Sequence, residues 1–435
     1  MTARGVRAAV AGVVAAALAG LGACTAPEPP EAVPALRPEL FRSGELAEPV
    51  RLGVLVPPLE GPGSEYRPLV EGARVAAYRF GLGGDAVEVS VGLDDGTPDG
   101  AVLAMRALLD AGVAGVVLAS PGPHTADAVA AADEAATAVV LPYGSAAGPA
   151  PGAWSLAPSP GVVAERVQDA LDGLAVRRPY RVVAADRPTP ARDDAQPEDS
   201  AGGAGSPDEP SWTGTPDDPE ATAAEIVTLL EQRLVDAVVV DAPAGDQAAL
   251  VVALQELLGT RQLPVVLSPD ALTPVFGDLL AAAGTSGGRL VGVGTDAQDH
   301  AALTGSGAGS RTASFLAAVR LAAGDPGCRN VYDDDACAAG VPRADAASHD
   351  AALALVRAVD AAGSVEPARV REALGGLRLG RGDGLAGPDL DFGTAQALAD
   401  DDVVVLHAST SDPGVRPTAA DGTRPALSWF AGAAP

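Results

Sequence analysis

The sequence contains no lysine, so all 29 basic side chains are arginine. This absence excludes a P-loop and any chemistry that depends on a lysine amine. Aromatic residues make up only 3% of the chain, so a core must consist mainly of Ala, Val and Leu. The histidines are few and offer no metal-ligand spacing: His124, His300, His349 and His407. The sequence therefore predicts no metal site and no cofactor.

Positive charge is also scarce relative to negative charge. The net charge of −28 at pH 7 argues against nucleic acid as a partner and is typical of a soluble, self-repelling exported protein. At 435 residues the chain is longer than one ordinary domain, and its hydrophobic content is 47%. We therefore expect two lobes of about 150 residues each, both with a proper core.

The N-terminus has the pattern of a secretory signal. Arg4 and Arg7 give it a basic start, and residues 8–19 form an apolar stretch that is too short to span a membrane. The following Leu-Gly-Ala-Cys24 resembles the bacterial lipobox, whose cysteine receives a lipid after cleavage. We expect a lipoprotein signal peptide at residues 1–23 and a lipid anchor that holds Cys24 at the extracytoplasmic face of the cell membrane. The alternative is a plain signal peptide with a chance cysteine.

Three further segments lack the periodicity of helices or strands. Residues 24–48 are rich in Pro, Ala and Glu, which predicts a flexible tether. Residues 186–220 contain mainly Pro, Gly, Asp, Ser and Ala, which predicts a disordered insert. Residues 411–435 are rich in Pro and Gly, and we expect them to form a C-terminal tail.

Two cysteines remain besides Cys24. Cys328 and Cys337 lie close together in the chain, and in an oxidising compartment such a pair most simply forms one disulfide. The loop that it closes contains the acidic run Asp333–Asp335, which is more typical of a solvated loop than of a calcium site.

Residues 50–147 alternate between β-branched runs and helical patterns. Strands are predicted at residues 50–56, 87–91, 113–119 and 138–141, with helical patterns between them. Strands separated by helices of this length are typical of βαβ units and a parallel sheet. A similar alternation follows residue 154, with strands predicted at 180–184, 237–240, 264–267 and 290–293. The expected fold class is therefore α/β.

Three successive stretches carry a family resemblance. They are RLGVLVPPLEGPGSEYRPLVEGARVAAYRF (51–80), VSVGLDDGTPDGAVLAMRALLDAGVAGVVLASP (89–121) and AVAAADEAATAVVLPYGSAA (128–147). In this order they resemble the type I periplasmic substrate-binding proteins of the branched-chain amino acid transport group. The resemblance implies two Rossmann-like lobes with parallel sheets joined by a hinge. Lobe 1 would comprise residues 49–153 and 297–378, and lobe 2 residues 154–296 and 379–410.

The same resemblance implies a function. Proteins of this family capture a small polar ligand, here expected to be an amino acid, by closing their two lobes around it. They then present it to an ABC permease. One alternative is a degenerate scaffold that serves as a sensor or an envelope interaction protein without transport. A secreted hydrolase is a weaker alternative, because no nucleophile, base and acid line up in the sequence.

The ligand crevice of a parallel sheet lies at the carboxyl ends of its strands. Hydroxyl groups and helix N-termini near these ends suit a ligand carboxylate. The candidate side chains in the first lobe are Ser64, Tyr66, Ser120, Thr125, Tyr143 and Ser145. Thr125 could instead cap the helix that follows it, and the two tyrosines could instead belong to the core.

A ligand ammonium that leaves water needs a carboxylate partner. Asp270 matches the position where amino-acid-binding members of the family place this acidic group. It could instead cap the helix that begins near Leu272. Asp241 ends a predicted strand that faces the same crevice and is the weaker candidate.

Overall fold

The computed structural model describes residues 41, 49–61, 63–144, 150–185, 212–259, 261–285, 288–305, 307–420 and 422–432. The chain divides into two compact units, Met1–Ala35 and Leu36–Pro435, and all described residues belong to the second. The predictions for the signal peptide, Cys24 and Ser145 lie outside the described residues. So does the predicted tether except for Phe41, which is buried in the core of lobe 1 and is therefore not part of a flexible tether. No helix in the described part of the chain combines the length and apolar character needed to cross a membrane.

The first lobe is built on a five-stranded parallel sheet with the order β2-β1-β3-β4-β5. Its strands are β1 (Val50–Val56), β2 (Val87–Leu93), β3 (Gly115–Leu118), β4 (Ala138–Leu141) and β5 (Ala153–Ser155). In the register of the sheet, Val54 lies between Val91 and Val117. Strands β3 and β4 are buried along their whole length, as a parallel sheet with covered faces requires.

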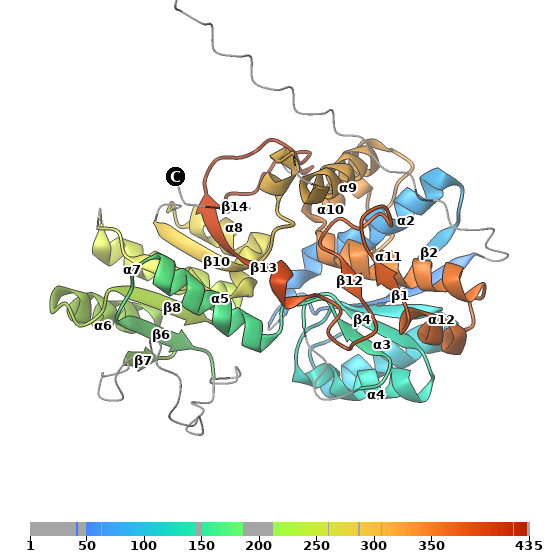
Figure 1. Ribbon diagram of the computed structural model, residues 1–435, viewed down its shortest axis with the longest axis horizontal. Helices are drawn as coiled ribbons and strands as arrows, with labels where there is room; N and C mark the ends of the chain where they lie inside the picture. Colours follow the sequence, from blue (N-terminus) through green and yellow to red (C-terminus); the bar gives the residue numbers. More distant parts are fainter. Residues whose placement is uncertain are drawn as a thin grey trace, which may run out of the picture. The chain divides into compact units, whose positions relative to one another are not determined.

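Helices cover both faces of this sheet (Figure 1). On one face Val54 packs with α2 (Glu71–Gly83), α11 (Ala346–Ala362) and α12 (Pro367–Leu374). On the other face the neighbouring Leu55 packs with α3 (Pro98–Asp110) and α4 (Ala126–Glu134). Successive side chains of a strand point to opposite faces, so one apolar run supplies both cores. The helix α9 (Gly307–Gly324) packs on α2 in a further apolar layer of this lobe.

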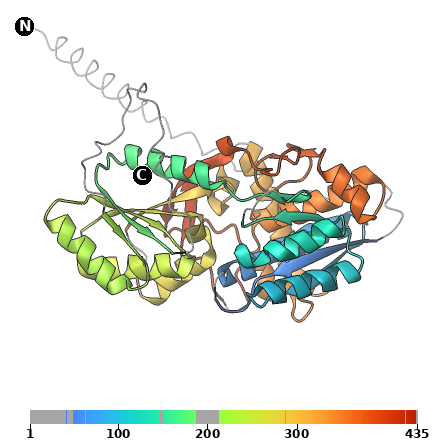
Figure 2. The ribbon, with the colours of Figure 1, turned by 90° about the horizontal axis from the view of Figure 1, so that it is seen from below.

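The second lobe is built on a seven-stranded sheet with the order β14-β13-β10-β9-β8-β6-β7. The parallel strands are β6 (Pro179–Val183), β7 (Trp212–Gly214), β8 (Ala237–Asp241), β9 (Pro264–Leu267) and β10 (Arg289–Thr295). The remaining two strands, β13 (Val403–Ser409) and β14 (Ser428–Ala431), run antiparallel to their neighbours. One face packs against α6 (Pro219–Glu231), α7 (Ala244–Leu258) and α8 (Pro274–Ala282), and α5 (Pro160–Gly173) covers the other (Figure 2).

Parts of the predicted insert and of the predicted tail belong to the second sheet, and residues 186–211 of the insert lie outside the described residues. Trp212–Gly214 forms β7, where Trp212 pairs with Tyr180 of β6, and α6 begins at Pro219. Residues 212–220 of the predicted insert are therefore ordered. In the predicted tail, β14 pairs with β13 and buries Trp429. A single tryptophan anchors each short edge strand, and composition averaged over a long polar segment conceals such a strand.

The predicted start of the last lobe 2 segment at residue 379 is also too early. The short strands β11 (Arg378–Leu379) and β12 (Leu390–Asp391) pair with each other in a separate sheet. Leu379, Leu390 and Phe392 are buried in the core of lobe 1. Strands of two residues carry no measurable periodicity, so the sequence pattern could not assign them to a lobe.

Two of the segments that pass between the lobes are hydrogen-bonded to each other. The Ser155 N–H donates to the Ala395 carbonyl over 2.8 Å, and the Ala397 N–H donates to the Ser155 carbonyl over 2.9 Å. Beside them, the Trp154 indole N–H donates to the Phe392 carbonyl over 2.8 Å. These bonds join the end of β5 to the chain that leads into β13, so the two crossings form one hinge.

The loop closed by Cys328 and Cys337 braces the start of α2. The two sulfur atoms are bonded, and the Cα atoms lie 5.3 Å apart. Within the loop, the Val331 N–H donates to Glu71 Oε2 over 3.1 Å. The Tyr332 hydroxyl donates to the Arg67 carbonyl over 3.2 Å, and the Arg67 guanidinium lies over the Tyr332 ring. The loop therefore fixes the segment η1 (Ser64–Val70) together with the first turn of α2.

Replacing both Cys328 and Cys337 with serine should lower the free energy of unfolding by about 2–3 kcal/mol. Opening a loop of this length restores that much conformational freedom to the unfolded chain. Urea unfolding of the oxidised protein and of the double variant would measure the difference. Mass spectrometry of unreduced peptides is the control, and free thiols at both positions in exported protein would contradict the pairing.

Glu71 should make the protein less stable as the pH rises. Burial raises the pKa of Glu71 to about 7, although the Val331 N–H opposes the rise. Between the unfolded pKa of about 4.5 and the folded value, the folded state binds more protons, so stability falls as pH increases through this window. Relative to wild type, the Glu71→Gln variant should therefore gain about 3 kcal/mol between pH 4.5 and pH 8.

Urea unfolding of both proteins at the two pH values would measure this gain. The glutamine carbonyl can still accept the Val331 N–H, so the hydrogen bond is retained. The matched control is Glu372→Gln on the exposed side of α12, which should show no such pH-dependent gain. Equal pH dependence in wild type and Glu71→Gln would contradict the prediction.

Candidate functional site

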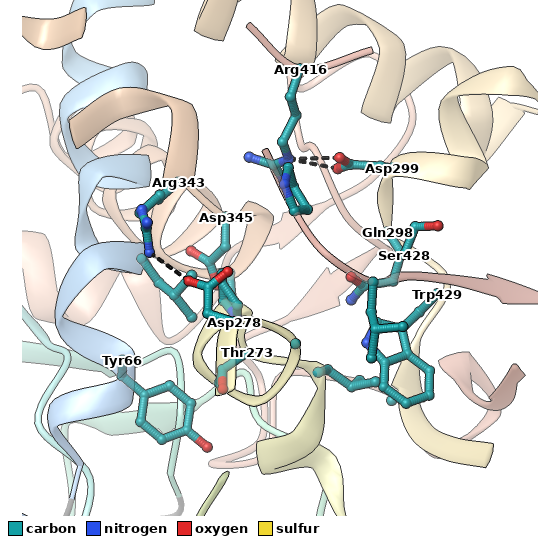
Figure 3. A pocket seen from close by; sticks show the side chains of 18 of the residues that line it. Tyr66, Thr273, Asp278, Gln298, Asp299, Arg343, Asp345, Arg416, Ser428 and Trp429 are labelled. Carbon is teal, nitrogen blue, oxygen red and sulfur yellow. Dashed lines mark hydrogen bonds and ion pairs between the residues drawn. The ribbon is translucent and has the colours of Figure 1, made fainter. Parts of the chain in front are cut away.

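A cavity of about 220 Å³ lies where the strand-end loops of the two lobes meet (Figure 3). Lobe 1 contributes Tyr66 from η1 and the segment Pro142–Tyr143 that follows β4. Lobe 2 contributes residues of η3 (Pro269–Leu272), the first turns of α8, and the segment that follows β10. The hinge contributes residues 156–158. The cavity therefore adjoins the carboxyl ends of β4, β9 and β10, in agreement with the rule for ligand crevices of parallel sheets.

The segment that connects β13 and β14 also forms a large part of the cavity wall. Its lining residues are Arg416, Pro417, Ala419, Thr423, Arg424, Pro425, Ala426 and Leu427, followed by Ser428 and Trp429 of β14. These residues all fall within the predicted C-terminal tail. The segment that was predicted to be a C-terminal tail thus forms part of the wall of the candidate site.

Two tyrosines stack on the lobe 1 side of the cavity. The rings of Tyr66 and Tyr143 lie 4.6 Å apart and are nearly parallel. The Tyr143 hydroxyl donates to Asp345 Oδ1 over 2.9 Å, and Asp345 caps α11 through the Ser348 N–H. Burial, followed by the charge of Asp345, raises the pKa of Tyr143 well above its usual value. Tyr143 is therefore a neutral hydrogen-bond donor at physiological pH.

Asp270 is bonded to a side chain of the opposite lobe. It is 5% exposed, lies inside η3, and its Oδ1 accepts a hydrogen bond from the Tyr66 hydroxyl. The alternative that Asp270 caps a helix is wrong, because Thr273 occupies the N-cap position of α8. Asp270 does not line the cavity, but it accepts a hydrogen bond from Tyr66, which does.

Every acidic side chain that lines the cavity contacts a partner within the described protein. Arg343 Nη1 lies 3.1 Å from Asp278 Oδ2, and Arg416 Nε lies 2.8 Å from both carboxylate oxygens of Asp299 (Figure 3). Asp345, the third, accepts from Tyr143 and Ser348. Burial raises the pKa of Asp345, and the hydrogen bonds from Ser348 oppose this rise. Each carboxylate in the cavity wall is therefore already paired with an arginine or hydrogen-bonded to hydroxyl groups of the protein.

Ser120 lies outside the cavity in a buried polar cluster. Its hydroxyl donates to Asp94 Oδ2 over 2.5 Å, and His124 Nε2 lies 2.6 Å from the same oxygen. In a catalytic triad the aspartate holds one ring nitrogen of histidine while the other receives the serine proton. Here the Ser120 hydroxyl and His124 Nε2 both contact Asp94 Oδ2, and His124 Nε2 is also the ring nitrogen nearest to Ser120. One ring nitrogen therefore faces both partners, and the three residues do not form a triad.

Three other predicted residues also lie outside the cavity: Ser64, Thr125 and Asp241. Ser64 begins η1, and Asp241 ends β8. The Thr125 hydroxyl donates to the Gly122 carbonyl over 2.8 Å and does not cap α4, so the capping alternative is wrong. The strand-end rule locates the correct edge of each sheet but does not say which strands contribute to the cavity.

Several lining residues escaped the sequence analysis. The polar ones are Thr273, Asp278, Thr295, Gln298, Asp299, Arg343, Asp345, Arg416, Thr423, Arg424 and Ser428. Thr295 and Gln298 follow the predicted strand at 290–293, so the same strand-end rule could have indicated them. The short apolar run Leu427–Ala431 within a polar tail was the available signal for β14.

No family model matches this sequence, and no curated protein matches it either. Solved structures do match. A leucine-binding protein from Thermotoga maritima superposes with a TM-score of 0.57 at 15% identity, covering 82% of this chain and 95% of its own. A type 1 periplasmic binding protein from Bordetella pertussis gives a TM-score of 0.57 at 15% identity, with coverages of 84% and 98%.

A third match is an ABC transporter substrate-binding protein from Desulfitobacterium hafniense in complex with Leu, with a TM-score of 0.55 at 13% identity. It covers 85% of this chain and 99% of its own. All three cover more than four fifths of this chain and almost all of their own. The chain therefore has the type I periplasmic binding protein fold.

Proposed function

We propose that this protein is an extracytoplasmic solute-binding protein that holds a small polar ligand between its two lobes. The observation that carries the proposal is the cavity enclosed by strand-end loops of both lobes and by the hinge. In this arrangement a rotation about the hinge changes access to the cavity without disturbing either core. Closure of the lobes around the ligand is the proposed mechanism.

The lining of the cavity favours a small ligand with an apolar part. Leu69, Leu156, Leu272 and Trp429 supply apolar surface, and Thr273, Gln298 and Ser428 supply uncharged hydrogen-bonding groups. A cavity of about 220 Å³ is small compared with the roughly 300–1,000 Å³ of sites for drug-sized molecules. A free amino acid has this size and this combination of groups, and it is the ligand class that we propose.

The proposed partner is an ABC permease that recognises the closed form. The proposed location is the extracytoplasmic face of the membrane, with Cys24 carrying the lipid anchor. The three structural neighbours include one named as an ABC transporter substrate-binding protein, which supports this context by analogy of fold alone.

The paired charges favour a second candidate function. A ligand ammonium needs a carboxylate, but Asp278, Asp299 and Asp345 already contact protein partners, and Asp270 accepts from Tyr66. A scaffold that has lost its ligand and serves as a sensor or envelope interaction protein would show such internally compensated charges. The two candidates differ in whether any solute binds.

If the ligand is an amino acid, Asp270→Ala should weaken its binding by about 2–5 kcal/mol, roughly 30- to several-thousand-fold. The substitution removes the carboxylate that lies behind Tyr66 in the cavity wall, and with it the hydrogen bond that Tyr66 donates to Asp270. Isothermal calorimetry of wild type against the twenty amino acids and small polyols identifies the ligand first. Calorimetry of the variant then measures the loss.

The matched control is Asp241→Ala, because Asp241 ends the neighbouring strand β8. Neither carboxylate lines the cavity, but Asp270 accepts a hydrogen bond from Tyr66, which does line it. The control substitution should leave the affinity within a few-fold of wild type. If no solute binds below millimolar concentration, the scaffold function replaces the transport function. If Asp270→Ala binds as tightly as wild type, Asp270 is not part of the site.

Cys24→Ala should release the protein from membranes or block its processing, since no other residue of the lipobox-like segment can carry the lipid. Fractionation of cells that express wild type or variant would show this in the distribution between membrane and soluble fractions. Cys328→Ala is the control, and it should leave the distribution unchanged. Membrane attachment of the Cys24→Ala protein at the wild-type level would exclude lipidation at this residue.

A further inference from the structure

The connection between β13 and β14 is longer than a hairpin needs. We name residues 410–427 the strap; all of them except residue 421 are described. Both strands that it connects belong to the sheet of lobe 2, so chain connectivity alone would keep the strap on that lobe. Its contacts nevertheless include residues of lobe 1.

An apolar side chain of the strap is buried in lobe 1. Val415 is 5% exposed and packs in the cluster that contains Val75 of α2, Phe315 of α9 and Val341. Beside it, Arg320 Nη2 of α9 donates to the Gly414 carbonyl over 2.7 Å. The strap is therefore docked in the helical layer of lobe 1 and does not merely lie over it.

The residue after Val415 adds a charged attachment. Arg416 Nε contacts both carboxylate oxygens of Asp299, which begins η4 (Asp299–Leu303) in the crossing between β10 and α9. Arg416 Nη1 donates to the carbonyls of Pro342 and Ala344, over 3.1 and 2.6 Å. The Arg416 and Asp299 side chains are only 16% and 12% exposed. Partial burial makes such a charge-assisted pair stronger than one on the surface.

We propose that the strap is a latch that fastens lobe 2 to lobe 1 and must detach when the lobes separate. The strap begins and ends in the lobe 2 sheet, and Val415 and Arg416 hold its middle against lobe 1. Since residues 416, 417, 419 and 423–427 of the strap also line the cavity, opening of the latch and exposure of the cavity are one event. The inference concerns the lobes alone and does not depend on which solute binds or on whether the protein serves transport.

Hydrogen exchange with mass spectrometry and X-ray scattering of the full chain would test the latch, using Arg416→Gln. In this variant, amides of residues 412–420 should exchange about tenfold to a hundredfold faster than in wild type, because the docked state of the strap is less populated. The radius of gyration should increase beyond the error of replicate measurements, because the lobes separate more often.

The matched control is Arg424→Gln. Arg424 also lies on the strap and lines the cavity, but its contacts with Asp412 and Thr418 stay within the strap. This variant should match wild type in both measurements. Val415→Ala weakens the apolar attachment without changing any charge, and it decides the question by the same two measurements if Arg416→Gln does not fold.

Faster strap exchange together with a larger radius in either variant supports the latch. Faster strap exchange with an unchanged radius overturns it, because the strap would then detach without consequence for the lobes. Unchanged strap exchange in both variants also overturns it, because Val415 and Arg416 would not hold the strap. An Arg424→Gln protein that behaves like Arg416→Gln would overturn the assignment of the latch to Arg416.

Discussion

The structure depends on one constraint: parallel strands end at the same edge of their sheet, and the chain has two such sheets to connect. Loops that follow successive strands therefore gather at one edge of each lobe. The segments that cross between the lobes must leave from these edges, and two of them pair through Ser155 and Ala395. Hinge, cavity and candidate ligand contacts thus arise from a single property of the sheet topology.

Two of the polar contacts that join the lobes at the cavity, Arg343–Asp278 and Tyr66–Asp270, differ in how much they stabilise the structure. Arg343 and Asp278 are each about one third exposed, and an exposed ion pair contributes about 0–1 kcal/mol. The bond from Tyr66 to Asp270 is buried, and a buried hydrogen bond to a charged group contributes about 1.5–3 kcal/mol. The Tyr66–Asp270 contact therefore contributes more than the Arg343–Asp278 pair, although nothing in the sequence indicates that Tyr66 and Asp270 meet.

Much of the fold could be predicted from the sequence because its signals are local. The apolar runs at 50–56, 113–119 and 138–141 alternate with helical patterns, and the structure confirms each strand. Strands β7 and β14 were missed because a few residues around one tryptophan were diluted by polar neighbours. Leu379 and Phe392 were assigned to the wrong lobe because the sequence of a short segment does not indicate which distant core its apolar side chains join.

The candidate site was less predictable for the same reason. The strand-end rule indicated Tyr66 and Tyr143, which line the cavity, but also Ser120 and Thr125, which do not. Arg343 and Arg416 lie in segments without strand or helix periodicity, and they reach the cavity through contacts with residues far away in the chain. Electrostatic partners of this kind depend on how the lobes are assembled, and a single sequence does not record that arrangement.

The Cys328–Cys337 loop supports the site without contributing to it. This loop contacts the Arg67 carbonyl through Tyr332 and Glu71 through Val331, just after Tyr66 in the chain. The disulfide closes this loop, and neither cysteine lines the cavity. A covalent bond remote from the cavity thus helps to fix the position of an aromatic ring in its wall.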